Sequence, residues 1–88
     1  MMPASLEPNC RMVVTIKELP GKGMAIHIQA TADDEKVTPR ELKELSRMTM
    51  ALAMGMRLVG TPAHVAEADT LVKNAGELLE KANKKQEA

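Results

Sequence analysis

The fold is decided by residues 38–62, which read TPRELKELSRMTMALAMGMRLVGTP. Thr38 is a residue type that caps helix N-termini, and Pro39 suits the first helical position because its missing N–H would have no partner there. Glu41 completes a Thr-x-x-Glu capping box, in which two orphan N–H groups are satisfied reciprocally. The stretch therefore predicts a helix that begins at Pro39.

A second helix is predicted to follow almost without a connection. Gly60 can take the left-handed conformation that ends many helices, so the first helix should stop at Val59. Thr61 and Pro62 then repeat the start signal, and an amphipathic pattern continues to about Lys84. Because the connection is so short, residues 38–84 are predicted to form a helical hairpin.

Two alternating runs precede the helices. Residues 11–17 and 24–31 alternate apolar and polar side chains, as half-buried strands do, and the turn sequence Pro20-Gly21-Lys22-Gly23 separates them. We predict a β-hairpin here, joined to the helices by a polar connection over 31–37. An isolated hairpin is marginal in water, so its apolar side must pack on something.

These elements predict an α+β fold: an N-terminal β-hairpin followed by a two-helix hairpin (ββαα), completed by dimerisation. We expect one domain over 11–84, with a flexible N-terminal tail at 1–10 and a frayed C-terminus at 85–88. The chain has 88 residues, eight Met and no Phe, Tyr or Trp. Without aromatic side chains a core this small is thin, and a second chain would add buried area.

The first predicted helix is apolar on two sides in its second half. One of these sides is a seam of mostly apolar residues at heptad-like spacing, which runs along the whole helix. The opposite side is basic at first and apolar afterwards, with Arg57 as the only charge between Met48 and Val59. The basic residues are Arg40, Lys43 and Arg47, and the apolar residues are Met50, Ala51, Met54 and Leu58.

Two interpretations of this second side stay open. In one, the second helix covers one side of the first helix and the β-hairpin covers the other. In the other, a second chain covers it, because methionines with nearby small residues pack adaptably. The two are compatible, since the hairpin could cover part of this side and a second chain the rest. We predict an interface made by Met50, Ala51, Met54, Arg57 and Leu58. Arg57 would reach solvent, pair with an acid in its own chain, or form an ion pair across the interface.

No set of residues predicts an enzyme. Cys10 is the only cysteine, and it is expected to be a spectator thiol rather than a disulfide or metal ligand. The acidic run at 33–35 is expected to be a solvated loop, and His64 with Glu67 to be an ordinary surface contact. We predict no catalytic, cofactor-binding or metal-binding residue.

The leading functional hypothesis is therefore a small non-enzymatic protein-interaction or regulatory module that acts as a homodimer through its first helix, with a further protein partner left open. The alternative is a nucleic-acid-binding regulator. Its candidate contacts lie on the second strand and on the basic side of the first helix: His27, Gln29, Arg40, Lys43 and Arg47. The zero net charge and the lack of aromatic stacking side chains count against that alternative.

The chain is expected to be cytoplasmic and not membrane-bound. Its N-terminus lacks a basic run followed by an apolar stretch, the pattern of a signal peptide. Residues 48–56 form the longest nearly uncharged apolar segment, which is too short to span a bilayer.

Overall fold

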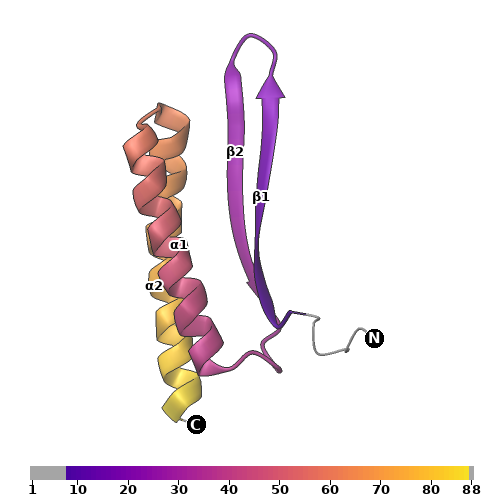
Figure 1. Ribbon diagram of the computed structural model, residues 1–88, viewed down its shortest axis with the longest axis vertical. Helices are drawn as coiled ribbons and strands as arrows, with labels where there is room; N and C mark the ends of the chain where they lie inside the picture. Colours follow the sequence, from indigo (N-terminus) through magenta and orange to yellow (C-terminus); the bar gives the residue numbers. More distant parts are fainter. Residues whose placement is uncertain (1–7, 88) are drawn as a thin grey trace.

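The computed structural model describes residues 8–87 and has the order β1 (Cys10–Leu19), β2 (Gly23–Ala32), α1 (Pro39–Val59) and α2 (Pro62–Glu87) (Figure 1). The predicted α+β class and the ββαα order are confirmed. The second helix continues past its predicted end near Lys84. Neither α1 nor α2 has a stretch long and apolar enough to cross a membrane.

The predicted tail at 1–10 lies mostly outside the described residues, as does Ala88 of the predicted frayed end. At Asn9, hydrogen bonds attach the chain to the base of the hairpin and to the start of α1. The backbone carbonyl of Asn9 accepts a hydrogen bond from the N–H of Asp33 at 2.8 Å. The Asn9 amide group also lies 3.3 Å from the Glu41 carboxylate.

The two strands form one antiparallel ladder closed by a short turn. Cys10 lies opposite Ala32 and Leu19 lies opposite Gly23. The turn needs positive φ angles, and glycines at 21 and 23 provide them, at 73° and 92°. Residues opposite each other in the ladder share a side of the sheet. The side chains that share a side with Met12 are called here the apolar side of the hairpin: Cys10, Met12, Val14, Ile16, Met24, Ile26, Ile28, Ala30 and Ala32, together with Glu18 near the tip.

Local capping chemistry fixes both ends of α1. The Thr38 hydroxyl accepts from the Glu41 N–H at 3.0 Å, and the Glu41 carboxylate accepts from the Thr38 N–H at 2.8 Å. At the other end Gly60 has a φ of 79° and its N–H donates to the carbonyl of Met56. The predicted start of α1 at Pro39 and its predicted end at Val59 are therefore both confirmed.

Small side chains let α1 and α2 approach closely. Ala53 of α1 and Ala68 of α2 are both buried in the main core cluster, beside Leu71. The Ser46 hydroxyl donates to the carbonyl of Ala75 at 2.6 Å, which links the two helices directly. The buried Thr49 hydroxyl donates to the carbonyl of Leu45, so the one polar residue in the predicted seam of α1 is satisfied.

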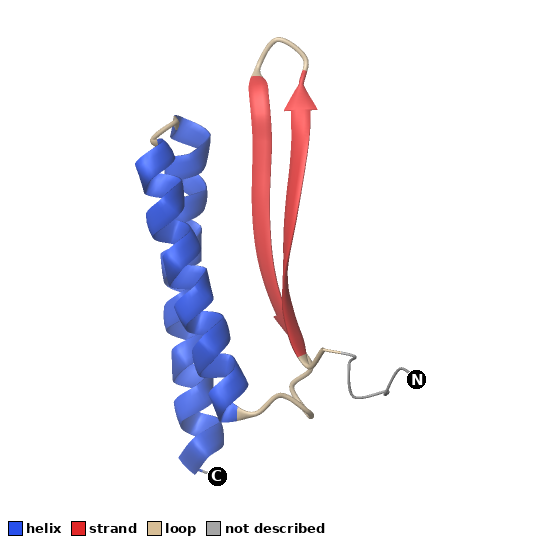
Figure 2. Cartoon of the chain, in the orientation of Figure 1, coloured by secondary structure: helices blue, strands red, loops and turns tan. Residues whose placement is uncertain are grey.

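The hairpin lies beside the helix pair rather than over it (Figure 2). In this view β2 is nearer to the helices than β1, and α1 passes in front of α2. The chain is flat, with principal extents of 47 × 35 × 17 Å. Ile28 is the only buried strand residue among those described, because the helices contact β2 mainly near its middle and the base of the hairpin.

Candidate functional site

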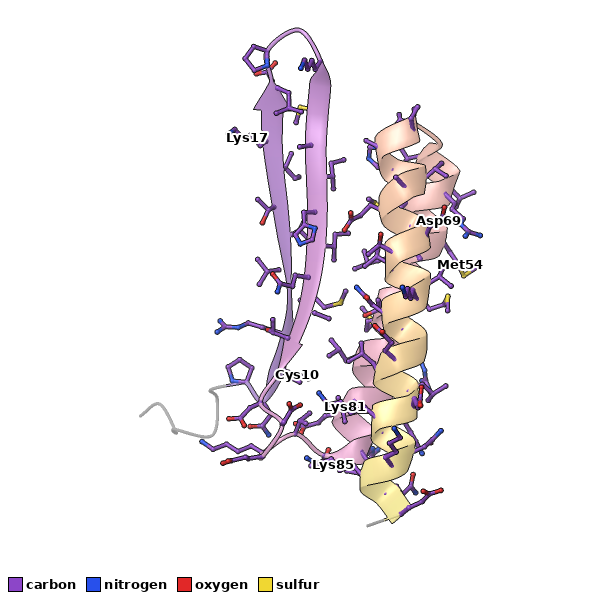
Figure 3. All side chains as sticks on the ribbon, turned by 180° about the vertical axis from the view of Figure 1, so that it is seen from behind. Cys10, Lys17, Met54, Asp69, Lys81 and Lys85 are labelled. Atoms are coloured by element: carbon purple, nitrogen blue, oxygen red, sulfur yellow. The ribbon has the colours of Figure 1, made fainter. Side chains whose placement is uncertain are left out.

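The hairpin does not cover the second apolar side of α1. Met50 and Ala51 are exposed, and the exposed fractions of Met54 and Leu58 are 64% and 88%. Figure 3 shows the Met54 side chain pointing away from the hairpin. Within residues 8–87 nothing packs over these side chains, so the interpretation in which the hairpin buries them does not describe this chain.

A shallow depression of about 520 Å³ lies on this side of the helix pair. Met50, Ala51 and Met54 of α1 line it, together with Leu79 of α2. The charged residues Lys43 and Arg47 also line it. The lining of the depression is therefore partly apolar and partly basic.

Arg57 forms an ion pair within the chain. Its guanidinium donates to the Asp69 carboxylate of α2, with Nη2 and Oδ1 2.8 Å apart. Both side chains are more than half exposed, so solvent weakens the attraction. Of the three interpretations of Arg57, the structure shows the pair with an acid of its own chain.

A groove of about 260 Å³ separates the apolar side of β1 from α1. Cys10 and Met12 form one wall, and Leu45 and Met48 form the other. Glu41 and Glu44 also line it. Partial burial and, secondarily, the negative charge of Glu41 raise the pKa of the Cys10 thiol, so the thiol stays protonated at neutral pH.

Towards the tip of the hairpin, the β1 half of its apolar side is exposed. The exposed fractions of Val14 and Ile16 are 51% and 60%, and Met24 opposite Glu18 is also exposed. The sequence predicted that this side must pack on something. In the described chain Met12 and Ile28 do so, and Ile28 lies opposite Val14 in the middle of the ladder.

The candidate nucleic-acid contacts do not form one surface. His27 and Gln29 line a cleft between β2 and α2. Lys43 and Arg47 border the depression around Met54 instead. Lys43 donates to Gln86 of α2 at 2.8 Å, Arg47 lies 3.6 Å from Glu44, and Arg40 is exposed at the start of α1.

Glu67 has a role that the sequence did not reveal. The sequence placed it beside His64, but the His64 ring lies against the Thr61 hydroxyl. The Glu67 carboxylate instead accepts the backbone N–H of Ile28 at 2.8 Å and lies 3.6 Å from the His27 ring. No local spacing signals this contact, because it joins residues 39 positions apart.

The acidic run at 33–35 is used in contacts within the chain. Asp34 forms an ion pair with Lys81, and its backbone carbonyl accepts from Lys85. The hydrogen bond and charge of Lys81 lower the pKa of Asp34 below its ordinary value. Among the described residues no three His, Cys, Asp or Glu side chains are grouped to hold a metal ion.

The geometry therefore defines a small ββαα domain with uncovered apolar surface on one helix and on one side of a hairpin. No protein-family model, no curated protein and no solved structure matches the chain.

Proposed function

We propose that this chain is a small non-enzymatic protein-interaction module that acts as a homodimer through the exposed side of α1. The observation that carries the proposal is the exposure of Leu58 and Met54 on a well-formed helix. Scattered exposed apolar residues are normal on a soluble protein, but a contiguous apolar area marks an interaction surface. Met50, Ala51, Met54 and Leu79 form such an area around the depression.

The thin core supports a second copy of the same chain as the molecule that covers the exposed side of α1. The fully buried side chains include only a few large apolar ones, led by Leu42 and Leu71, and none is aromatic. A second chain would add the buried area that the fold lacks. Methionine side chains at 50 and 54 would adapt to the contact without a rigid complementary shape.

Size-exclusion chromatography coupled to light scattering tests the proposal over a range of concentrations up to high micromolar. The wild type is expected to be a dimer, and Leu58→Asp a monomer with an unchanged circular-dichroism spectrum. Ala66→Asp is the matched control, because Ala66 is exposed on α2 and lies opposite its buried stripe. A wild type that is monomeric at the highest concentration would contradict the proposal.

A further inference from the structure

The two edges of the β-hairpin differ in what lies beside them. The outer edge of β2 faces α2, where the Glu67 carboxylate accepts the Ile28 N–H at 2.8 Å. The outer edge of β1 lies on the side of the hairpin away from the helices (Figure 1). An exposed strand edge presents unpaired N–H and C=O groups, which can pair with a strand of another chain. The edge of β1 is therefore the one at which a further strand can add.

The contact with Glu67 also determines which backbone groups β1 presents at its outer edge. Because the Ile28 N–H donates to α2, Ile28 and its ladder partner Val14 point their N–H and C=O groups away from each other. Every second residue of a strand repeats this orientation, so Met12 and Ile16 also point their backbone groups outwards. Within residues 8–87, no hydrogen bond outside the ladder reaches the backbone of these three residues. They form a row of free donors and acceptors.

The sequence of β1 does little to protect this edge. Proteins protect exposed edges with prolines, bulges or charges within the strand. β1 contains no proline, and its ladder with β2 runs without a bulge from Cys10 to Leu19. Its charged residues lie towards its two ends, and residues 13–16 between them are all β-branched, uncharged and exposed. This central stretch has the composition of a strand that pairs on both of its edges.

The charges of β1 indicate the chemistry of the added strand. Arg11 and Lys17 lie together on the side of the sheet opposite its apolar side, and both are exposed. Neither forms an ion pair within residues 8–87, and β2 contributes no acidic residue to this side. Asp33 lines a pocket with Arg11, but its carboxylate accepts from the Glu35 N–H. Acidic side chains opposite the two cations would be the favourable cross-strand partners.

An antiparallel third strand would bring these charges close together. The backbone groups of Arg11, Thr15 and Lys17 point towards β2, so these residues would form non-hydrogen-bonded pairs with the added strand. Such pairs bring the opposing Cα atoms to about 4.5 Å, the closer of the two spacings. The residues that face Arg11 and Lys17 are then six positions apart in the added strand. A second copy of β1 does not fit, because its single acid, Glu18, lies on the apolar side.

We propose that the outer edge of β1 binds an extended segment of another protein as an antiparallel third strand, with two acidic residues six positions apart that face Arg11 and Lys17. Backbone hydrogen bonds with Val14 and its outward-pointing neighbours provide the affinity, and the two ion pairs select the partner. The inference goes beyond the proposed homodimer and does not depend on it, because Met54 lies on a surface that points away from the hairpin (Figure 3).

Fluorescence anisotropy with synthetic peptides tests the charge of the partner at low ionic strength. The probe is a fluorescein-labelled peptide of sequence Glu-Val-Thr-Val-Thr-Val-Glu with a capped C-terminus, and the matched control has lysine in place of both glutamates. The glutamate peptide is expected to bind with a dissociation constant at least roughly fivefold lower, because two opposite-charge pairs replace two like-charge pairs. Equal dissociation constants would overturn the acidic partner, and no binding of either peptide would overturn the site.

N-methylated versions of the glutamate peptide test the backbone pairing on the unaltered protein. The central valine lies opposite Val14 and donates to its carbonyl, so N-methylation there should weaken binding by roughly tenfold or more. N-methylation of the preceding threonine is the matched control, since that N–H points away from β1 and its loss should change binding little. Equal losses for the two peptides would overturn strand addition.

A proline variant tests the same hydrogen bonds from the side of the protein. Val14→Pro removes an N–H that does not pair with β2, and proline is tolerated on an edge strand with its N side facing solvent. The variant should keep the circular-dichroism spectrum and lose peptide binding, whereas Val14→Thr should keep both. Equal binding by the two variants would overturn the proposal, and if Val14→Pro does not fold, the N-methylated peptides decide.

Two further measurements separate this inference from the other ways of filling the edge. If a Thr15→Cys chain that also carries Cys10→Ala forms a disulfide with itself on oxidation, two β1 strands pair, and the proposed partner is wrong. The monomeric Leu58→Asp variant should bind the glutamate peptide as well as the wild type does, and loss of binding in it would overturn the independence of the two surfaces. A wild type that is monomeric but binds the peptide would contradict the homodimer and support the strand addition.

Discussion

The carboxylate of Glu67 in α2 accepts a hydrogen bond from the backbone N–H of Ile28 in β2, at 2.8 Å. Adjacent residues of a strand direct their N–H groups to opposite edges, and because the Ile28 N–H donates to α2 it is the one that points away from β1. Glu67 therefore occupies the position that the carbonyl of a further strand would take. Ile28 is buried and the Glu67 side chain is only 12% exposed, so water cannot easily replace this bond.

Glu67→Ala is expected to destabilise the fold by about 1–3 kcal/mol, because it leaves the Ile28 N–H without a partner. In a domain of this size, each kcal/mol lowers Tm by about 4–8 °C. Glu67→Gln is the matched control, since its amide oxygen can still accept the bond, and it should lose clearly less. Thermal unfolding followed by circular dichroism measures both. Equal Tm values for wild type and Glu67→Ala would show that the contact contributes nothing.

Thr38→Ala is expected to reduce the free energy of unfolding by about 1 kcal/mol, the usual effect of removing a helix N-cap. The hydroxyl it removes is the acceptor for the Glu41 N–H at 3.0 Å. Thr38→Ser keeps a hydroxyl at the same place and should be nearly neutral. Urea unfolding at constant pH compares the three proteins, and a loss in Thr38→Ser equal to that in Thr38→Ala would argue against the cap.

Acid is expected to weaken the fold partly through Glu41. The hydrogen bonds that its carboxylate accepts, first from the Thr38 backbone N–H and then from the Asn9 side chain, lower the pKa of Glu41 below its ordinary value of 4.5. The unfolded chain therefore binds this proton at a higher pH than the folded chain. The stabilisation is fully present above about pH 4.5 and is lost as the pH falls through the lowered pKa.

Urea unfolding between pH 7 and pH 3 measures this effect. Glu41→Gln can still accept the Thr38 N–H but cannot titrate, so its stability should fall less steeply than that of wild type in the acidic range. Asp34→Asn is a second comparison, because the hydrogen bond and charge of Lys81 lower the pKa of Asp34 in the same sense. If wild type and Glu41→Gln have parallel profiles, the Glu41 carboxylate is not coupled to folding.

The sequence predicted the fold best where the determinants are local. The ends of α1 follow from Thr38, Glu41 and Gly60, whose partners lie within four residues in the chain. The alternation around Met12 and Ile28 likewise predicted the strands and the side that faces the core. These signals come from backbone chemistry and periodicity, which a single sequence displays.

Contacts between elements could not be read from local spacing. Glu77 and Lys81 have the spacing of a helical ion pair, yet Lys81 pairs with Asp34. Glu67 lies three residues from His64 and contacts Ile28 instead. The partner of each of these side chains depends on how the hairpin lies against α2. That arrangement depends in turn on the packing of the core cluster that contains Ile28 and Leu71. For the same reason the sequence left open what covers Met54, and the structure shows it uncovered within the described chain.

Leu71→Ala is expected to be the most damaging single truncation in the core, by about 2–5 kcal/mol. Leu71 is fully buried in the cluster that joins α1, α2 and β2. Native domains are stable by only about 5–15 kcal/mol, so this variant should lose a large part of its free energy of unfolding. Val65→Ala in the same helix is the control, since Val65 is exposed and its truncation should change the urea midpoint little. Similar midpoints for the two variants would contradict the assigned core.

Gly55→Ala and Gly76→Ala are expected to stabilise the monomeric chain by about 0.5–1 kcal/mol each, because alanine is the better helix former at interior positions. The prediction applies to both residues, since neither has an atom within 4 Å of a built Cβ. The Leu58→Asp background should keep the chain monomeric, so urea unfolding in that background isolates the effect on the helix. An unchanged or lowered urea midpoint in both variants would contradict the placement of the two glycines at open interior positions of the helices.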